Sequence, residues 1–134
     1  MAVSITNSTI AALNTHQILT PNAATSTEIG GSEVFTFTPK ASGGKIALIF
    51  SEASTAATAK ASYSIAAGDM WASKAITGSI GSTTAAGKLE VLEIDTALVM
   101  QDDGTILITV SPGDTTAAML LGTHHMSMYA IELL

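Results

Sequence analysis

The sequence predicts an all-β protein: an antiparallel β-sandwich of jelly-roll-like form with an extended N-terminal segment. Short segments of alternating apolar and polar residues are separated by Gly, Pro, Asn and Asp turn signals at intervals of roughly 8 to 15 residues. No segment has the periodicity of an amphipathic helix. The chain has 134 residues, the size of one domain. We expect residues 1–31 to form an N-terminal arm or the first strands, and residues 32–134 to form the β-sandwich domain.

The strongest strand signal lies at residues 105–111. Residues 102–104, Asp-Asp-Gly, precede it as a turn, here taken as a hairpin, because Asp tolerates the left-handed region and Gly enters it without a Cβ penalty. Ile106, Ile108 and Val110 then share one face, and the other face carries Thr105, Leu107, Thr109 and Ser111. Pro112 closes the strand because it has no N–H to donate to a sheet.

Earlier segments fit the same pattern. Residues 1–31 carry short apolar groups within Ser, Thr, Asn and Ala, which predicts short strands or an arm joined by loops. Residues 33–38 predict a strand with alternating faces. Residues 45–50 are apolar on both faces and predict a central, doubly covered strand. Residues 60–65 predict another half-buried strand.

The later segments are less regular. Residues 78–87 are small and polar and predict a surface loop. In residues 88–94 the alternation slips, which predicts a bulge between Val91 and Leu92. Residues 115–122 and 126–134 predict the closing strands. In the last strand we expect Tyr129, Ile131 and Leu133 to face the core, and Met126 and Met128 to lie on the opposite face.

The charge balance limits the partners. The chain has 5 basic and 11 acidic residues, a net charge of −6, and no Arg, which argues against nucleic acid. No run reaches the roughly 18 apolar residues of a membrane span. Charged residues make up only 12% of the chain. A surface covered by Ala, Ser, Thr and Gly suits either a subunit surrounded by neighbours or a small domain that tolerates such residues.

No motif predicts catalysis or a cofactor. Residues 81–88 resemble a phosphate-binding loop but have the wrong glycine spacing and lack the hydroxyl that must follow the Lys. His124 and His125 are adjacent and would point to opposite faces of a strand, so a metal site there would need a turn. Asp102, Asp103 and Asp114 could meet a Ca²⁺ ion, but they are natural turn residues. Glu90 and Glu93 could form an acid/base pair, but they are as well explained as surface residues of a strand. We therefore expect no enzyme, no cofactor, no metal and no small-molecule substrate.

A resemblance to a known family is carried by the order of five segments. They are residues 43–50 (GGKIALIF), 66–69 (AAGD), 86–92 (AGKLEVL), 102–108 (DDGTILI) and 129–133 (YAIEL). From Gly43 to Leu134 this order resembles the small virion structural proteins of tailed bacteriophages, most of all the head-decoration or capsid-cement proteins. The chain departs from the pattern at Met100, where such proteins often have Phe, and in its longer connection at residues 123–126.

The resemblance implies a non-enzymatic viral structural protein, often a homotrimer, that binds the outside of a bacteriophage capsid and bridges neighbouring subunits of the major capsid protein. The expected location is the capsid exterior of the virion. Trp71, the only Trp, could cap the core or anchor an interface. Met126 and Met128 are adaptable contact residues. The candidate interface residues are Val3, Ile5, Ile10, Trp71, Met126 and Met128.

Two other readings fit the sequence. The chain could be a different virion component, from the neck, the tail or the base of a fibre. It could also be a carbohydrate-binding or adhesive β-sandwich module, for which Trp71, Tyr63 and Tyr129 would form a small aromatic platform.

Overall fold

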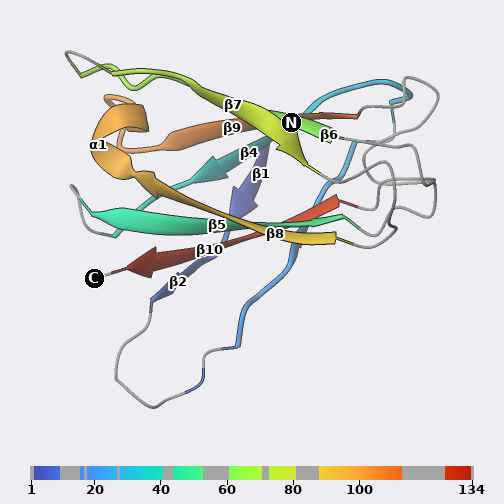
Figure 1. The fold of residues 1–134 in the computed structure, drawn as a ribbon, viewed down its shortest axis with the longest axis horizontal. Coiled ribbons are helices and arrows are strands. Elements are labelled where there is room, and N and C mark those ends of the chain that lie inside the picture. The colour runs from blue at the N-terminus through green and yellow to red at the C-terminus, as the bar shows by residue number, and fades with distance from the viewer. Residues whose placement is uncertain are drawn as a thin grey trace.

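The computed structural model describes residues 2–9, 16, 18–26, 28–40, 44–52, 61–70, 73–80, 88–112 and 126–133. The structure of these residues is mostly β, with a single short helix among them (Figure 1). The elements in chain order are β1 (Ala2–Ile5), β2 (Asn7–Thr9), β3 (Asn22–Ala23), β4 (Glu33–Phe37), β5 (Lys45–Glu52), β6 (Ala61–Ile65), β7 (Ile76–Ile80), β8 (Lys88–Asp95), α1 (Thr96–Val99), β9 (Ile106–Pro112) and β10 (Met126–Leu133).

The strands form two mixed sheets, which lie in two layers. Sheet A has the order β1-β4-β9-β6-β7, and sheet B has the order β2-β10-β5-β8, with β3 also paired to β10. The pairs β1 with β4 and β2 with β10 are parallel, and the other pairs are antiparallel. In Figure 1, β4, β6, β7 and β9 lie in the upper layer and β5, β8 and β10 in the lower.

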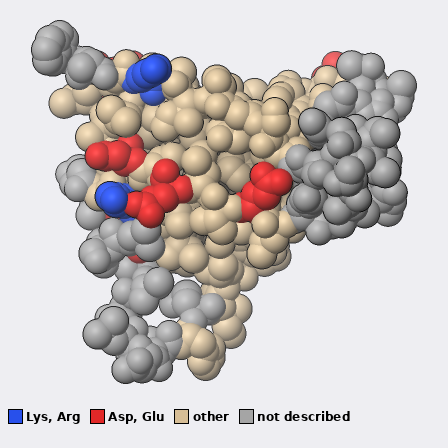
Figure 2. Space-filling view, viewed as in Figure 1, with Lys and Arg blue, Asp and Glu red and all other residues tan. Residues whose placement is uncertain are grey.

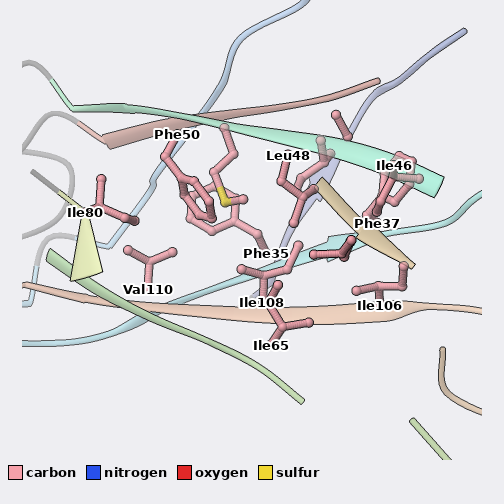
Figure 3. Close-up of a cluster of buried hydrophobic side chains, with 14 of the residues drawn as sticks. Phe35, Phe37, Ile46, Leu48, Phe50, Ile65, Ile80, Ile106, Ile108 and Val110 are labelled. Carbon is pink, nitrogen blue, oxygen red and sulfur yellow. The ribbon is translucent and has the colours of Figure 1, made fainter. Parts of the chain in front are cut away.

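The core fills the space between the two sheets. Ile46, Leu48 and Phe50 point from β5 toward Ile106 and Ile108 of β9 (Figure 3), and all five side chains are buried. The rings of Phe50 and Tyr63 stack across the layers with their centroids 5.1 Å apart. The fold therefore gains its main stabilisation from apolar burial between the layers.

Most of the predicted strands are confirmed. β9 has Ile106, Ile108 and Val110 buried on one face, as the alternation predicts. β5 is central, between β10 and β8, and its residues 46–50 are buried on both faces. β4 and β6 also lie where the sequence places strands. The predicted strand at residues 115–122 lies outside the described residues.

The turn at residues 102–104 is confirmed, but it is not a hairpin. Gly104 has φ 81°, and its amide donates to the carbonyl of Gln101. The turn follows α1 and leads into β9 of sheet A, whereas β8, the strand before α1, belongs to sheet B. The helix was not expected. Asp95 caps it by accepting a hydrogen bond from the amide of Ala97.

Two local predictions are wrong. β8 has no bulge, because it pairs with β5 through eight consecutive residues from Lys88 to Asp95. Its alternation is regular, with Ile94 and Leu92 toward the core, while Leu89 and Val91 lie exposed on the outer face. The predicted loop at residues 78–87 is wrong at residues 78–80, which belong to β7 and pair with β6, while residues 81–87 lie outside the described residues.

The face of β10 is the reverse of the prediction. Met126, Met128 and Ala130 are buried in the core, whereas Tyr129 and Ile131 are half-buried on the outer face. Ranking Tyr and Ile above Met as core residues selected the wrong face. The inward row ends at Glu132, whose carboxylate is buried but accepts hydrogen bonds from Asn7 Nδ2 at 2.7 Å and Lys40 N at 3.0 Å.

The described part of residues 1–31 consists of strands paired with both sheets. β1 lies parallel to β4 in sheet A, and β2 lies parallel to β10 in sheet B. Thr6 lies between them, where the chain crosses from one sheet to the other. In the described part of the chain, no helix is long and apolar enough to cross a membrane.

Candidate interaction surface

The outer face of sheet B exposes large apolar side chains. Leu89 is 68% exposed and Val91 is 65% exposed, although both belong to a fully paired strand. In the register of sheet B, Val91 faces Ile49 of β5, and Ile49 faces Tyr129 of β10. These three side chains form a row across three strands. We call the set Leu89, Val91, Ala47, Ile49, Tyr129 and Ile131 the apolar face.

The apolar face has a charged rim at one end. Lys45 Nζ donates to Glu93 Oε1 at 2.8 Å, and both side chains are more than half exposed. This hydrogen bond and the negative charge of Glu93 raise the pKa of Lys45 above its ordinary value. Such an exposed pair adds little stability, but it neutralises the carboxylate closest to Val91 along the outer face of β8. An apolar centre with a polar rim is the usual anatomy of a protein interface.

Within the described residues, β8 is also a free sheet edge. It ends sheet B and pairs with β5 alone. Thr96, which follows β8, donates its amide to the carbonyl of Gly44 at 3.0 Å, directly opposite in the same register. Hydrogen-bonded and non-hydrogen-bonded pairs alternate in an antiparallel ladder. The N–H and C=O groups of Leu89, Val91 and Glu93 therefore point away from β5, toward the open edge.

The outer face of sheet A has a different character. Serine and threonine predominate among its outward residues, and Ser62 and Ser64 of β6 face Ser79 and Thr77 of β7. In one row Ser111 Oγ lies 2.7 Å from Ser32 Oγ, within hydrogen-bond distance. The hydroxyl groups on this face are Ser32, Thr36, Ser62, Ser64, Thr77, Ser79, Thr109 and Ser111. β7, one of the two end strands of sheet A among the described strands, is thus polar where β8 is apolar.

The charged side chains of the described residues are sparse on the face drawn in Figure 2. There the Asp, Glu and Lys atoms occupy a few spots within a broad uncharged surface. This agrees with the charged fraction of 12% in the sequence. Contacts made by such a surface depend on shape and apolar burial more than on ion pairs.

Four of the six predicted interface residues lie in the described part of the chain. Ile5 is 4% exposed, Met126 is 1% exposed and Met128 is fully buried, so these three side chains belong to the core. Val3 is half-buried and packs against the same core. Ile10 and Trp71 lie outside the described residues. Strict alternation through residues 88–95 would have placed Leu89 and Val91 on one face, but not decided whether that face is exposed.

A polar clamp holds the N-terminal segment to both sheets. Asn22 Oδ1 accepts hydrogen bonds from the amide and the hydroxyl of Thr6, each at 3.2 Å. Asn22 Nδ2 donates to the carbonyls of Thr20 and Met128 at 2.9 and 3.0 Å. The carboxylate of Glu33, 2% exposed, accepts from the amides of residues 25 and 26. The segment therefore acts as part of the domain.

The residues that the sequence offered as candidates for catalysis or metal binding do not come together in the described part of the chain. Glu90 and Glu93 point to opposite faces of β8, so they cannot act as a carboxylate pair on one substrate. Asp103 Oδ1 accepts from the amide and hydroxyl of Thr105, as a turn residue does. Among the described residues no three His, Cys, Asp or Glu side chains are grouped to hold a metal. His124 and His125 lie outside those residues.

Comparisons with known proteins do not identify the chain. No protein-family model, no curated protein and no solved structure matches it.

Proposed function

We propose that this chain is a structural protein of a tailed-bacteriophage virion, a decoration protein that binds the outside of the capsid and bridges neighbouring subunits of the major capsid protein. The observation that carries the proposal is the apolar face. Leu89 and Val91 are exposed on a rigid, fully paired strand, next to Ile49 and Tyr129. A soluble chain keeps such side chains in the open mainly where a partner covers them.

We further propose that the fold is a jelly-roll β-sandwich. Counted from β3 as the first of eight strands, sheet B has the order 1-8-3-6 and sheet A has the order 2-7-4-5. This is the wrapping order of a jelly roll, in which two Greek keys are folded together, and every neighbouring pair in it is antiparallel. β1 and β2 are then an N-terminal addition to the two sheet edges.

The repetition of binding sites on a capsid lattice explains how a small contact surface would be enough for stable binding. A capsid presents the same site many times, so a subunit that touches two neighbours gains avidity without a large interface. Self-association multiplies these contacts further. The low charge of the chain fits a protein surrounded by such contacts.

The test is to separate a lysate of the source by density gradient and to follow this chain by mass spectrometry against DNA-filled particles. Decoration predicts co-migration in hundreds of copies per particle, because the binding sites repeat with the lattice. A few copies per particle would assign the chain to the neck, tail or fibre base. Absence from the particles would contradict the virion proposal, and glycan binding by the purified chain would then favour the adhesive module.

A matched pair of variants then tests the surface. Ile131→Glu adds a charge to the apolar face, and Ser64→Glu adds the same charge to the outer face of sheet A. Both side chains lie on outer faces, so neither change buries a charge in the core. Loss of co-migration in Ile131→Glu alone would support docking through the apolar face. Equal binding by both variants would contradict it.

A further inference from the structure

The open edge of β8 has two properties that a partner must match together. Its outward N–H and C=O groups, at Leu89, Val91 and Glu93, need an extended backbone. Its exposed side chains at Leu89 and Val91 need apolar neighbours on the same face. At one end of sheet A, β7 offers an extended backbone but presents Thr77 and Ser79 on its outer face. At the other end, β1 exposes Ala2 and Ser4. β8 itself offers both.

We propose that β8 pairs with β8 of a second copy of this chain, antiparallel, about a two-fold axis that passes through Val91. A two-fold axis perpendicular to the sheet keeps outer faces together, so Val91 lies opposite Val91 and Leu89 opposite Glu93 of the second copy. These are the residues whose backbone groups are directed to the edge. They would therefore form the hydrogen-bonded pairs of the new ladder.

Charge and apolar matching disfavour the registers centred on Glu90, Leu92 and Glu93. Centring the axis on Glu90 or on Glu93 would place like charges directly opposite one another, which destabilises a strand pair. Centring it on Leu92 would put both exposed apolar residues opposite carboxylates, Val91 opposite Glu93 and Leu89 opposite Asp95. The Val91 register leaves only Leu89 beside a carboxylate, and that carboxylate, Glu93, is already paired with Lys45 of its own chain.

The pairing would extend the apolar face without covering it. The row Tyr129, Ile49 and Val91 would continue into Val91, Ile49 and Tyr129 of the second copy, across one continuous sheet. Each copy carries a net charge of −6, which opposes association. At physiological ionic strength, charges separated by more than about 8 Å are largely screened. Added salt should therefore strengthen the dimer.

The chain has no Cys, so engineered cysteines test the register directly. In the proposed pair the two Cα atoms of residue 91 lie about 5.5 Å apart, within the range that a disulfide spans. Oxidised glutathione should therefore link Val91→Cys into covalent dimers, while Leu89→Cys alone should remain unlinked. A mixture of Leu89→Cys and Glu93→Cys should form the mixed dimer. Thr77→Cys, on an end strand of sheet A, is the control for disulfides that form by random collision between molecules.

Sedimentation equilibrium of the purified chain provides the second readout. The wild-type chain should reach twice 13.6 kDa with rising concentration. Val91→Glu should weaken the dimer by at least about tenfold, because it sets two like charges opposite one another at the axis. Thr77→Glu should leave the dimer unchanged. If Val91→Glu fails to fold, the cysteine series still decides the register.

Three results would overturn the inference: a wild-type chain that stays monomeric, a trimer whose Val91→Cys variant forms no disulfide, or equal cross-linking of all the single-cysteine variants. The purified chain alone gives these results, so the inference is independent of capsid binding. A protein that co-migrates with capsids but lacks the β8 pair would refute the dimer and leave the proposed function standing.

Discussion

Leu48 and Leu89 provide a matched test of which face of sheet B is internal. They lie on adjacent strands and are the same residue type, but Leu48 is fully buried and Leu89 is 68% exposed. Leu48→Ala should lower the free energy of unfolding by about 3–5 kcal/mol, since it removes buried methyl groups and leaves a cavity. Leu89→Ala should cost less than about 1 kcal/mol, because only a third of its surface is covered.

The measurement is urea denaturation followed by far-ultraviolet circular dichroism. With a slope of about 2 kcal/mol per molar urea, Leu48→Ala should lower the midpoint by about 1.5–2.5 M, and Leu89→Ala by less than about 0.5 M. Both variants should be studied below the dimerisation range, so that association does not enter the comparison. Equal losses at the two positions, or a larger loss at Leu89, would refute the assignment of faces in β5 and β8.

Three further predictions follow from local contacts. Asn22→Ala should lower the free energy of unfolding by about 1–3 kcal/mol, because it removes the hydrogen-bond partner of the Thr6 amide and of the buried Met128 carbonyl. Urea denaturation would measure the loss, and a value below about 0.5 kcal/mol would contradict the clamp. Gly78→Ala should lower the free energy of unfolding by about 1–3 kcal/mol, because the ring of Tyr63 occupies the space that a Cβ would need. It should also change the near-ultraviolet circular dichroism of Tyr63, and an unchanged spectrum and stability would contradict this packing. The pKa of Asp103 is lowered because its carboxylate accepts hydrogen bonds from Thr105. The stabilising contribution of these bonds is therefore present above the ordinary Asp pKa of 3.8 and is lost as the pH falls through the lowered pKa. Thr105→Val should raise the pKa of Asp103 measured by carbon NMR, and an unchanged pKa would argue against the hydroxyl contact.

The sequence predicts the all-β class and the central strand because both depend on local, period-2 information. β9 alternates cleanly, and β5 is apolar on both faces, so each reveals its environment without reference to the rest of the chain. The order of strands in the sheets has no such local signal. Turn residues 102–104 look the same whether they join two paired strands or lead from a helix to the other sheet.

The errors at β8 and β10 have one physical cause. Both strands are apolar on both faces, so alternation alone does not say which face is internal. In β10 the internal row contains Met126, Met128 and Glu132, and Glu132 is tolerated because its carboxylate is hydrogen-bonded to segments more than 90 residues away. Partners at that separation cannot be inferred from the neighbouring sequence. The apolar face was not predicted either. A bulge between Val91 and Leu92 was expected to bring the apolar residues of this strand onto one face, so Leu89 and Val91 were not expected to lie on an exposed face.

The crossing of the N-terminal segment between the two sheets has a consequence for biosynthesis. Among the described strands, β2 pairs with β10 alone, and β10 lies between β2 and β5. While the chain is being translated, β2 therefore has no strand to join until residues 130–132 have left the ribosome. Synthesis proceeds at about 5–20 residues per second, so β2 waits several seconds or more for β10, whereas β1 can pair with β4 much earlier. Joining of the two ends should be among the last steps of folding, and until then one edge of β5 stays open to other nascent chains.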